Sequence, residues 1–172
     1  MSPQASVLVP ADAAHDVGAA LRREIDGLLP ADWAWDGKRT LDFGSGLVRS
    51  SAAGLPLEDA SLDLVVATSV FTALADHWPG CLLELHRLLA PGGILIGAFP
   101  GEELSRGAVD APWGEARAGA TLTADGESFE VAVYKLLVSP WWTCARWRQA
   151  FDILRVEPSG LNGHGVVVAR KP

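Results

Sequence analysis

The 172-residue sequence has only two cysteines and no apolar run long enough to span a membrane. Cys81 and Cys144 fall in segments that we expect to be helical, with neither the spacing of a metal site nor that of a disulfide framework. The first sixteen residues lack the basic leader and long apolar stretch of a signal peptide. We therefore expect a cytoplasmic protein without a membrane partner, whose two cysteines are reduced packing residues.

Basic residues are also scarce, since 14 Lys and Arg stand against 21 Asp and Glu, for a formal net charge of −7. This balance opposes sequence-independent binding to nucleic acid, which depends on Lys and Arg displacing counterions from phosphates. Hydrophobic residues make up 49% of the chain, which is typical of a globular domain. We expect one domain over residues 1–172, with an N-terminal helical flank (1–38), a core (39–100), an insertion (101–138), and a C-terminal helix and strand pair (139–172).

Apolar periodicity indicates the elements of this domain. Val17, Leu21, Ile25 and Leu28 follow the spacing of an amphipathic helix over residues 12–29. Continuous apolar runs predict buried strands over 38–43, 62–70 and 94–99. A leucine-rich helix is predicted over 78–89, ended by Pro91, Gly92 and Gly93. A strand, a helix and a strand in this order predict a parallel pair joined by a right-handed crossover.

The second half of the chain contains weaker signals. Glycine and alanine dominate residues 101–126, with Trp113 as the lone bulky residue, and we interpret this part as a surface insertion. Strand character returns over 129–138. Ser139 and Pro140 form a good helix start, and two final strands are expected over 151–156 and 165–169.

Four segments in this order carry a resemblance: TLDFGSG, GLPLEDASLDLVVATSVF, LLELHRLLAPGGILIGAF, and FDILRVEPSG with GHGVVVARK. Together they resemble the class I S-adenosylmethionine-dependent methyltransferases of the type 11 group, over roughly residues 39–100 and 139–172. The resemblance implies an α/β fold with a Rossmann-like open, mostly parallel sheet whose last strand is antiparallel. It also implies methyl transfer from S-adenosylmethionine to a small-molecule acceptor, which the sequence does not identify.

The resemblance places the cofactor at the ends of two strands. In an open parallel sheet, ligands bind outside the carboxyl ends of the strands, and glycine there lets the backbone approach a ligand. Asp42 would help to hold the amino-acid end of the cofactor, and the set implied by the resemblance is Asp42, Gly44, Ser45, Gly46, Thr68 and Ser69. The alternative is that DFGSG is only a tight strand exit. Catalytic residues stay unknown.

The sequence departs from the family after the second glycine. Val48 stands where the family has a third glycine, and only residues 47–61 separate the glycine turn from the next strand. That segment is too short for two further strands with their helices, so the strand that carries the family's ribose-binding acid is missing from the pattern. Asp59 and Asp63 are better explained as a turn residue and a strand-opening residue than as ribose ligands.

This shortening predicts a sheet that is truncated at one edge. The first strand would then expose hydrogen-bonding groups beside Leu41 and Phe43. The helices that would cover this end would be missing too, which would leave an exposed apolar patch. We expect either a homodimer through this edge or marginal stability. A degenerate scaffold or pairing protein without cofactor binding is therefore the alternative function, and another nucleotide-binding α/β protein is a weaker one.

Other polar and aromatic residues have less specific interpretations. His77 stands where a general base could reach the pocket, but it also fits a helix start. His86 is interpreted as a partly exposed helix residue, His164 as a turn residue before the last strand, and His15 as a helix-start residue, with no metal-ligand spacing among the four. The tryptophans at 141, 142 and 147 fit core packing or a substrate platform. Trp33 and Trp35 would close over a pocket or pin the N-terminal helix.

Overall fold

The computed structural model describes residues 17–43, 55–68, 70–73, 78–100, 120–125, 133–138, 140–161 and 163–172. The elements in chain order are α1 (Ala19–Ile25), the 3₁₀ helix η1 (Asp26–Leu28), β1 (Thr40–Asp42), β2 (Leu62–Thr68), α2 (Val70–Ala73), α3 (Trp78–Leu88), β3 (Leu89–Phe99), β4 (Ala120–Asp125), β5 (Val133–Val138), α5 (Pro140–Trp147), β6 (Asp152–Leu161) and β7 (His164–Arg170). None of the described helices is long and apolar enough to cross a membrane.

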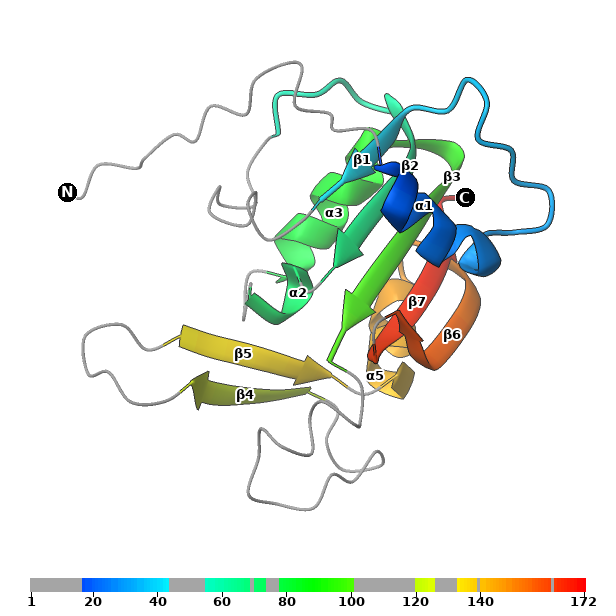
Figure 1. Ribbon diagram of the computed structural model, residues 1–172. Helices are drawn as coiled ribbons and strands as arrows, with labels where there is room; N and C mark the ends of the chain where they lie inside the picture. The colour runs from blue at the N-terminus through cyan, green and yellow to red at the C-terminus, as the bar shows by residue number, and fades with distance from the viewer. Residues whose placement is uncertain are drawn as a thin grey trace.

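A five-stranded open sheet with the order β1-β2-β3-β7-β6 forms the centre of the molecule (Figure 1). β1 pairs with β2, and β2 with β3, in parallel. β7 is antiparallel to both β3 and β6, so it is the one strand of this sheet that runs against the others. The predicted fold class is confirmed: a Rossmann-like, mostly parallel sheet in which the last strand of the chain is antiparallel.

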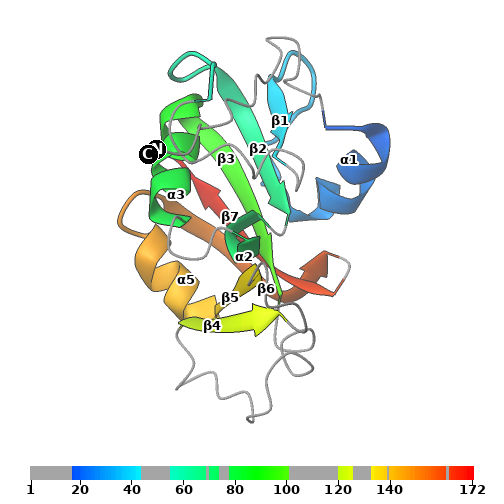
Figure 2. The same cartoon turned by 90° about the vertical axis from the view of Figure 1, so that its left-hand side faces the viewer.

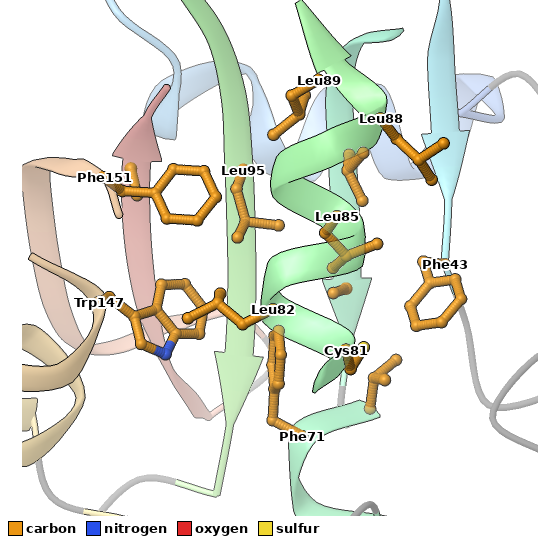
Figure 3. Packing of buried hydrophobic residues seen from close by; sticks show 14 of the residues in the cluster. Phe43, Phe71, Cys81, Leu82, Leu85, Leu88, Leu89, Leu95, Trp147 and Phe151 are labelled. Atoms are coloured by element: carbon orange, nitrogen blue, oxygen red, sulfur yellow. The ribbon is translucent and has the colours of Figure 1, made fainter. Parts of the chain in front are cut away.

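Helices α3 and α5 cover one face of the sheet, and α1 covers the other (Figure 2). On the α3 face, leucines at the three-and-four spacing of α3 pack against alternate residues of the strands, together with Trp147 and Phe151 (Figure 3). We call this cluster the α3-side core. Leu85, Leu88 and Leu95 are fully buried in it, and each buried leucine side chain contributes about 1.5–3 kcal/mol to folding.

The opposite face carries the α1-side core, formed by alternate strand residues such as Leu64, Val66, Ile96 and Val168 together with Ile25 of α1. The hydroxyl of Thr40 accepts a hydrogen bond of 3.1 Å from the backbone N–H of Val17, which joins the start of this segment to β1.

Trp33 and Trp35 continue the cover of the α1 face and meet edge to face, with their ring centroids 5.8 Å apart. Trp35 donates from Nε1 to a carboxylate oxygen of Asp26 at 2.9 Å, and the guanidinium of Arg22 lies 4.8 Å from its ring. Of the two interpretations of this pair, these contacts support the one in which it pins the N-terminal helix.

Several boundaries differ from those predicted. The described part of the N-terminal helix begins at Ala19, and residues 12–16 lie outside the described part of the chain. β2 ends at Thr68, because Val70 already belongs to α2. β3 begins at Leu89, before the Pro91-Gly92-Gly93 turn. Gly92 has a positive φ of 79°, and its N–H donates to the carbonyl of Lys171. This hydrogen bond keeps the strand attached to the sheet through the turn.

β4 was not predicted, because its sequence ATLTAD lacks the long apolar side chains that mark the other strands. It pairs in antiparallel fashion with β5, from Ala120 opposite Val138 to Asp125 opposite Val133, and the pair forms a separate two-stranded ribbon. This ribbon lies beyond the carboxyl ends of β2 and β3 (Figures 1 and 2). The predicted insertion therefore contributes structure at that end of the sheet.

The apolar patch expected at this end of the sheet stays a prediction, because residues 44–54 lie outside the described part of the chain. Leu41 and Phe43 are only 2% and 5% exposed, since both pack into the α3-side core. These two residues therefore present no apolar patch to solvent. The homodimer through β1 stays a prediction, which the mass of the protein in solution can test.

Candidate functional site

The carboxyl ends of β1 and β2 meet at one edge of the sheet. Asp42 pairs with Val66, and Thr68 follows two residues later, at the tip of β2. Because side chains alternate along a strand, Asp42 and Thr68 share the face that carries Val66 and the α1-side core. Both side chains are half-buried. The structure thus brings two of the predicted cofactor residues to one face and one edge of the sheet.

Pairing of β1 with β2 continues as far as Phe43, whose backbone N–H donates to the carbonyl of Val66 at 2.7 Å. The chain therefore leaves the sheet directly after Phe43, where the glycine turn was predicted. Gly44, Ser45, Gly46 and Ser69 lie outside the described residues. Their assignment to the site stays a prediction.

The donor set at this edge fits the amino-acid end of S-adenosylmethionine. The carboxylate of Asp42 is suited to an ammonium group, and the hydroxyl of Thr68 can donate or accept. No second acid follows the carboxyl end of β1, β2 or β3 within the part of the chain that the structure describes. The ribose acid of the family therefore has no counterpart among the residues described at this edge.

Asp63 lies at the amino end of β2, opposite the candidate site. Its carboxylate accepts a hydrogen bond of 3.0 Å from the backbone N–H of Arg39 and lies 3.5 Å from Nζ of Lys38. Burial by itself raises the pKa of Asp63, but the hydrogen bonds from Arg39 and the charge of Lys38 outweigh it and leave the pKa below its usual value. These contacts agree with the strand-opening interpretation of Asp63.

Arg87 of α3 binds residues 55–59, the segment that leads into β2. Its guanidinium donates to the carbonyls of Leu57 at 2.9 Å and Leu55 at 3.2 Å, and to the Asp59 carboxylate at 2.5 Å. The same guanidinium binds both carboxylate oxygens of Glu84, at 2.8 and 2.6 Å. Glu84 in turn accepts from the N–H of Leu55 at 2.8 Å. We call Arg87, Glu84 and the groups of Leu55, Leu57 and Asp59 that they bind the clamp. Asp59 belongs to it, in line with its interpretation as a turn residue.

The clamp also explains the ionisation of Glu84. The hydrogen bond from Arg87 holds the pKa of Glu84 below its usual value, although burial acts in the opposite direction. The sequence predicts the pairing of Glu84 with Arg87, because a glutamate three residues before an arginine on one helix lies next to it. It contains no signal that the same arginine reaches residues 55–59.

Both cysteines are free and buried. Burial raises the pKa of the Cys81 thiol to about 12 and also raises that of Cys144, so neither thiol is activated as a nucleophile. Within the described ranges no group of three or more His, Cys, Asp or Glu residues is arranged to hold a metal ion.

Two of the four histidines are described. They lie near opposite ends of β3, His86 towards its amino end and His164 towards its carboxyl end. The His86 ring packs edge-on against Phe151 near the end of α3, with ring centroids 5.1 Å apart, and burial followed by the charge of Lys171 lowers its pKa. His164 is the first residue of β7 and not a turn residue before that strand, and it therefore lies near the carboxyl end of β3. His15 and His77 lie outside the described residues.

Trp147 belongs to the core rather than to a substrate platform. It is 2% exposed and packs against Phe71, with ring centroids 5.0 Å apart. Trp142 is half-buried and packs edge-on against Trp78 at 5.1 Å. Nothing is described for the Trp141 side chain.

An open cavity of about 380 Å³ lies beside α1, away from the candidate site, and is lined by Arg22, Arg23, Asp26 and Trp35. Trp35 donates a hydrogen bond to Asp26, and the guanidinium of Arg22 lies over its ring. The groups that line the cavity therefore largely bind one another. This cavity contains none of the residues of the candidate site.

Part of the chain is similar to known proteins. Residues 30–97 match the family model described as a methyltransferase domain. Over 70 residues the chain is 33% identical to the mitochondrial arginine-hydroxylase NDUFAF5 of Danio rerio, a match that covers 38% of this chain and 20% of that protein. The chain thus spans about a fifth of the curated relative that it matches.

Two solved structures superpose on part of the chain. A putative S-adenosylmethionine-dependent methyltransferase from Listeria monocytogenes superposes with a TM-score of 0.53 at 10% identity, over 72% of this chain and 68% of that one. An S-adenosylmethionine-dependent methyltransferase from Methanosarcina mazei gives a TM-score of 0.49 at 24% identity, over 70% and 64% of the two chains. Residues 30–97 are thus similar to a methyltransferase domain, and the chain shares its fold with the Listeria protein.

Proposed function

We propose that the chain binds S-adenosylmethionine at the carboxyl ends of β1 and β2 and transfers its methyl group to a small-molecule acceptor in the cytoplasm. The observation that carries the proposal is the meeting of Asp42 and Thr68 on one face at this edge, within the segment that matches the methyltransferase family. Ligands of open α/β sheets bind at such an edge. Methyl transfer requires mainly that the protein position two reactants in a site from which water is excluded.

The same site also limits the proposal. A ribose acid is not found among the described residues of the edge, so the amino-acid end of the cofactor carries more of the recognition. The curated relative is named an arginine-hydroxylase, which shows that proteins with a similar segment bear more than one activity name. A test of binding must therefore come before a test of transfer.

Asp42 gives the first test. Asp42→Asn keeps the size of the side chain and removes its charge, so the affinity for S-adenosylhomocysteine, measured by titration calorimetry, is expected to fall by about 10- to 100-fold. Asp32→Asn is the matched control, because Asp32 is an exposed aspartate on the N-terminal segment, with a side chain 77% exposed. Its affinity is expected to equal that of the unmodified protein.

The outcomes separate the two functions. Saturable heat that depends on Asp42 supports the cofactor site, and release of labelled methyl from S-adenosylmethionine to an acceptor then excludes a scaffold without cofactor. No heat at millimolar S-adenosylhomocysteine would contradict the proposal and favour the degenerate scaffold.

A further inference from the structure

Leu83 lies on the outer face of α3 and is the most exposed large hydrophobic side chain in the described part of the chain. It is 62% exposed, whereas its neighbours Leu82 and Leu85 are 4% and 0% exposed and pack into the α3-side core. Leu83 therefore points away from the sheet. A single exposed leucine is ordinary on a protein surface, so the charges that flank it decide what this face can bind.

Exposed acidic side chains lie on one flank of α3, where the clamp holds residues 55–59 against the helix. Leu57 packs against the α3-side core, and its neighbour Glu58 is exposed. The side chain of Asp59 is 79% exposed, although it binds Arg87. Glu58 forms no ion pair with any residue that the structure describes. This flank therefore presents negative charge to solvent, part of it without a partner.

Exposed arginines lie on the other flank of α3, which α5 borders. Trp142 of α5 packs edge-on against Trp78 at the start of α3, with ring centroids 5.1 Å apart. The guanidinium of Arg146 lies 5.7 Å from the Trp142 ring. Arg146 and Arg148, which directly follows α5, are both exposed, and neither forms an ion pair within the described ranges. This flank therefore presents positive charge.

The two charged flanks lie on opposite sides of Leu83. Successive residues of an α-helix are about 100° apart around its axis, so residues two positions apart point in roughly opposite directions. Glu84 points to residues 55–59 and His86 points to Phe151, which follows α5. Figure 3 shows Phe151 to one side of α3. Because Glu84 and His86 are at nearly the same height along the helix, the acidic and basic flanks face each other across its second half.

A face with this pattern is complementary to a second copy of itself. In a contact with two-fold symmetry, the same surface patch of each copy meets the other. With the symmetry axis along α3, the two Leu83 side chains meet at the centre, and α5 of one copy covers residues 55–59 of the other. Arg146 and Arg148 then lie opposite Glu58 of the second copy. With the axis across α3, arginines would instead face arginines, so the charges select the first arrangement.

We propose that two copies of the chain pair through this face, with Leu83 at the centre and an exchange of opposite charges between α5 and residues 55–59 on each side. The leucine supplies the apolar contact, and the charges at the rim set the orientation. This surface differs from the β1 edge, through which the sequence predicts a homodimer, and it contains none of the candidate cofactor residues. The pairing is independent of the proposed function.

Sedimentation velocity at increasing protein concentration tests the pairing. The unmodified protein is expected to shift from the mass of one chain towards that of two. Leu83→Lys should raise the dissociation constant of the dimer at least about tenfold, because it removes the central apolar contact and sets two positive charges against each other. Leu154→Lys is the matched control, since Leu154 is also exposed, at 42%, but lies on β6. Its dimer should be as stable as that of the unmodified protein.

An exchange of charges tests the orientation. One variant combines Arg146→Glu with Arg148→Glu, and the other is Glu58→Arg. Each alone sets like charges against each other in a symmetric dimer, so its dissociation constant should rise at least about tenfold. Mixed in equal amounts, the two variants should form a heterodimer, because every acid then faces an arginine. Circular dichroism verifies that each variant keeps the fold, as expected for exposed positions.

Three results would overturn the proposal. The first is an unmodified protein that has the mass of one chain at every concentration. The second is a dimer that Leu83→Lys leaves intact, since its contact must then be another surface such as the β1 edge. The third is a mixture of the two charge variants that pairs no better than either variant alone.

Discussion

Gly97→Ala is expected to destabilise the fold by about 3 kcal/mol, because overpacking a rigid core costs roughly 1–3 kcal/mol and this position leaves no room. A Cβ at residue 97 would lie 2.3 Å from Cη2 of Trp147 and 3.4 Å from Cε2 of Phe71. Trp147 cannot swing away, since it is 2% exposed and packs against Phe71 and Phe151. Figure 3 shows this indole between Leu82 and Phe151 in the α3-side core.

Thermal unfolding measures the effect. A loss of about 3 kcal/mol lowers the Tm of a chain of this length by roughly 6–12 °C. Gly27→Ala is the matched control, because nothing lies within 4 Å of a Cβ built there. Adding Trp147→Phe to the alanine variant should restore part of the loss. Equal melting temperatures for Gly97→Ala and Gly27→Ala would show that α5 does not close on β3 as described.

Arg87→Met is the second change with a large expected effect, about 2 kcal/mol of unfolding free energy at pH 7. It removes the clamp on residues 55–59 and leaves Glu84, whose side chain is only 12% exposed, without its charged partner. Loss of a charged hydrogen-bond partner costs about 1.5–3 kcal/mol. Urea unfolding measures the difference. Arg155→Met is the control, because the Arg155–Glu157 pair lies on the surface, where such pairs contribute 0–1 kcal/mol.

The effect of Arg87→Met should depend on pH in one direction. Arg87 lowers the pKa of Glu84 in the folded state, so this carboxylate stabilises the fold above its unfolded value of 4.5 and the contribution is lost as pH falls through the lower folded value. The variant lacks this contribution. The gap between the two proteins should therefore narrow as pH falls below about 4.5, and a gap that widens there would contradict the clamp.

The strands and helices that could be predicted from the sequence are those whose buried side chains give a clear pattern of apolar residues. β1, β2 and β3 are apolar runs buried on both faces, and α3 shows leucines at helical spacing, so each was located to within a few residues. Their order along the sheet was not predicted, because no local pattern in the sequence contains it. β4 was missed because small residues and threonines carry no strong period.

The candidate site was predictable where it depends on strand ends. Asp42 and Thr68 each follow an apolar run, and parallel strands bring such residues to one edge. His164 was interpreted only as a turn residue, because its place at this edge depends on the antiparallel direction of β7. The burial of Leu41 and Phe43 agrees with the buried strand predicted over 38–43.

A crystal structure of the protein soaked with S-adenosylhomocysteine tests the central claim most directly. We predict electron density for the ligand outside the carboxyl ends of β1 and β2, with its amino group within hydrogen-bond distance of the Asp42 carboxylate and its sulfur turned towards β3 and β7. Density at the cavity beside α1, or none at saturating ligand, would contradict the claim that this strand edge is the cofactor site.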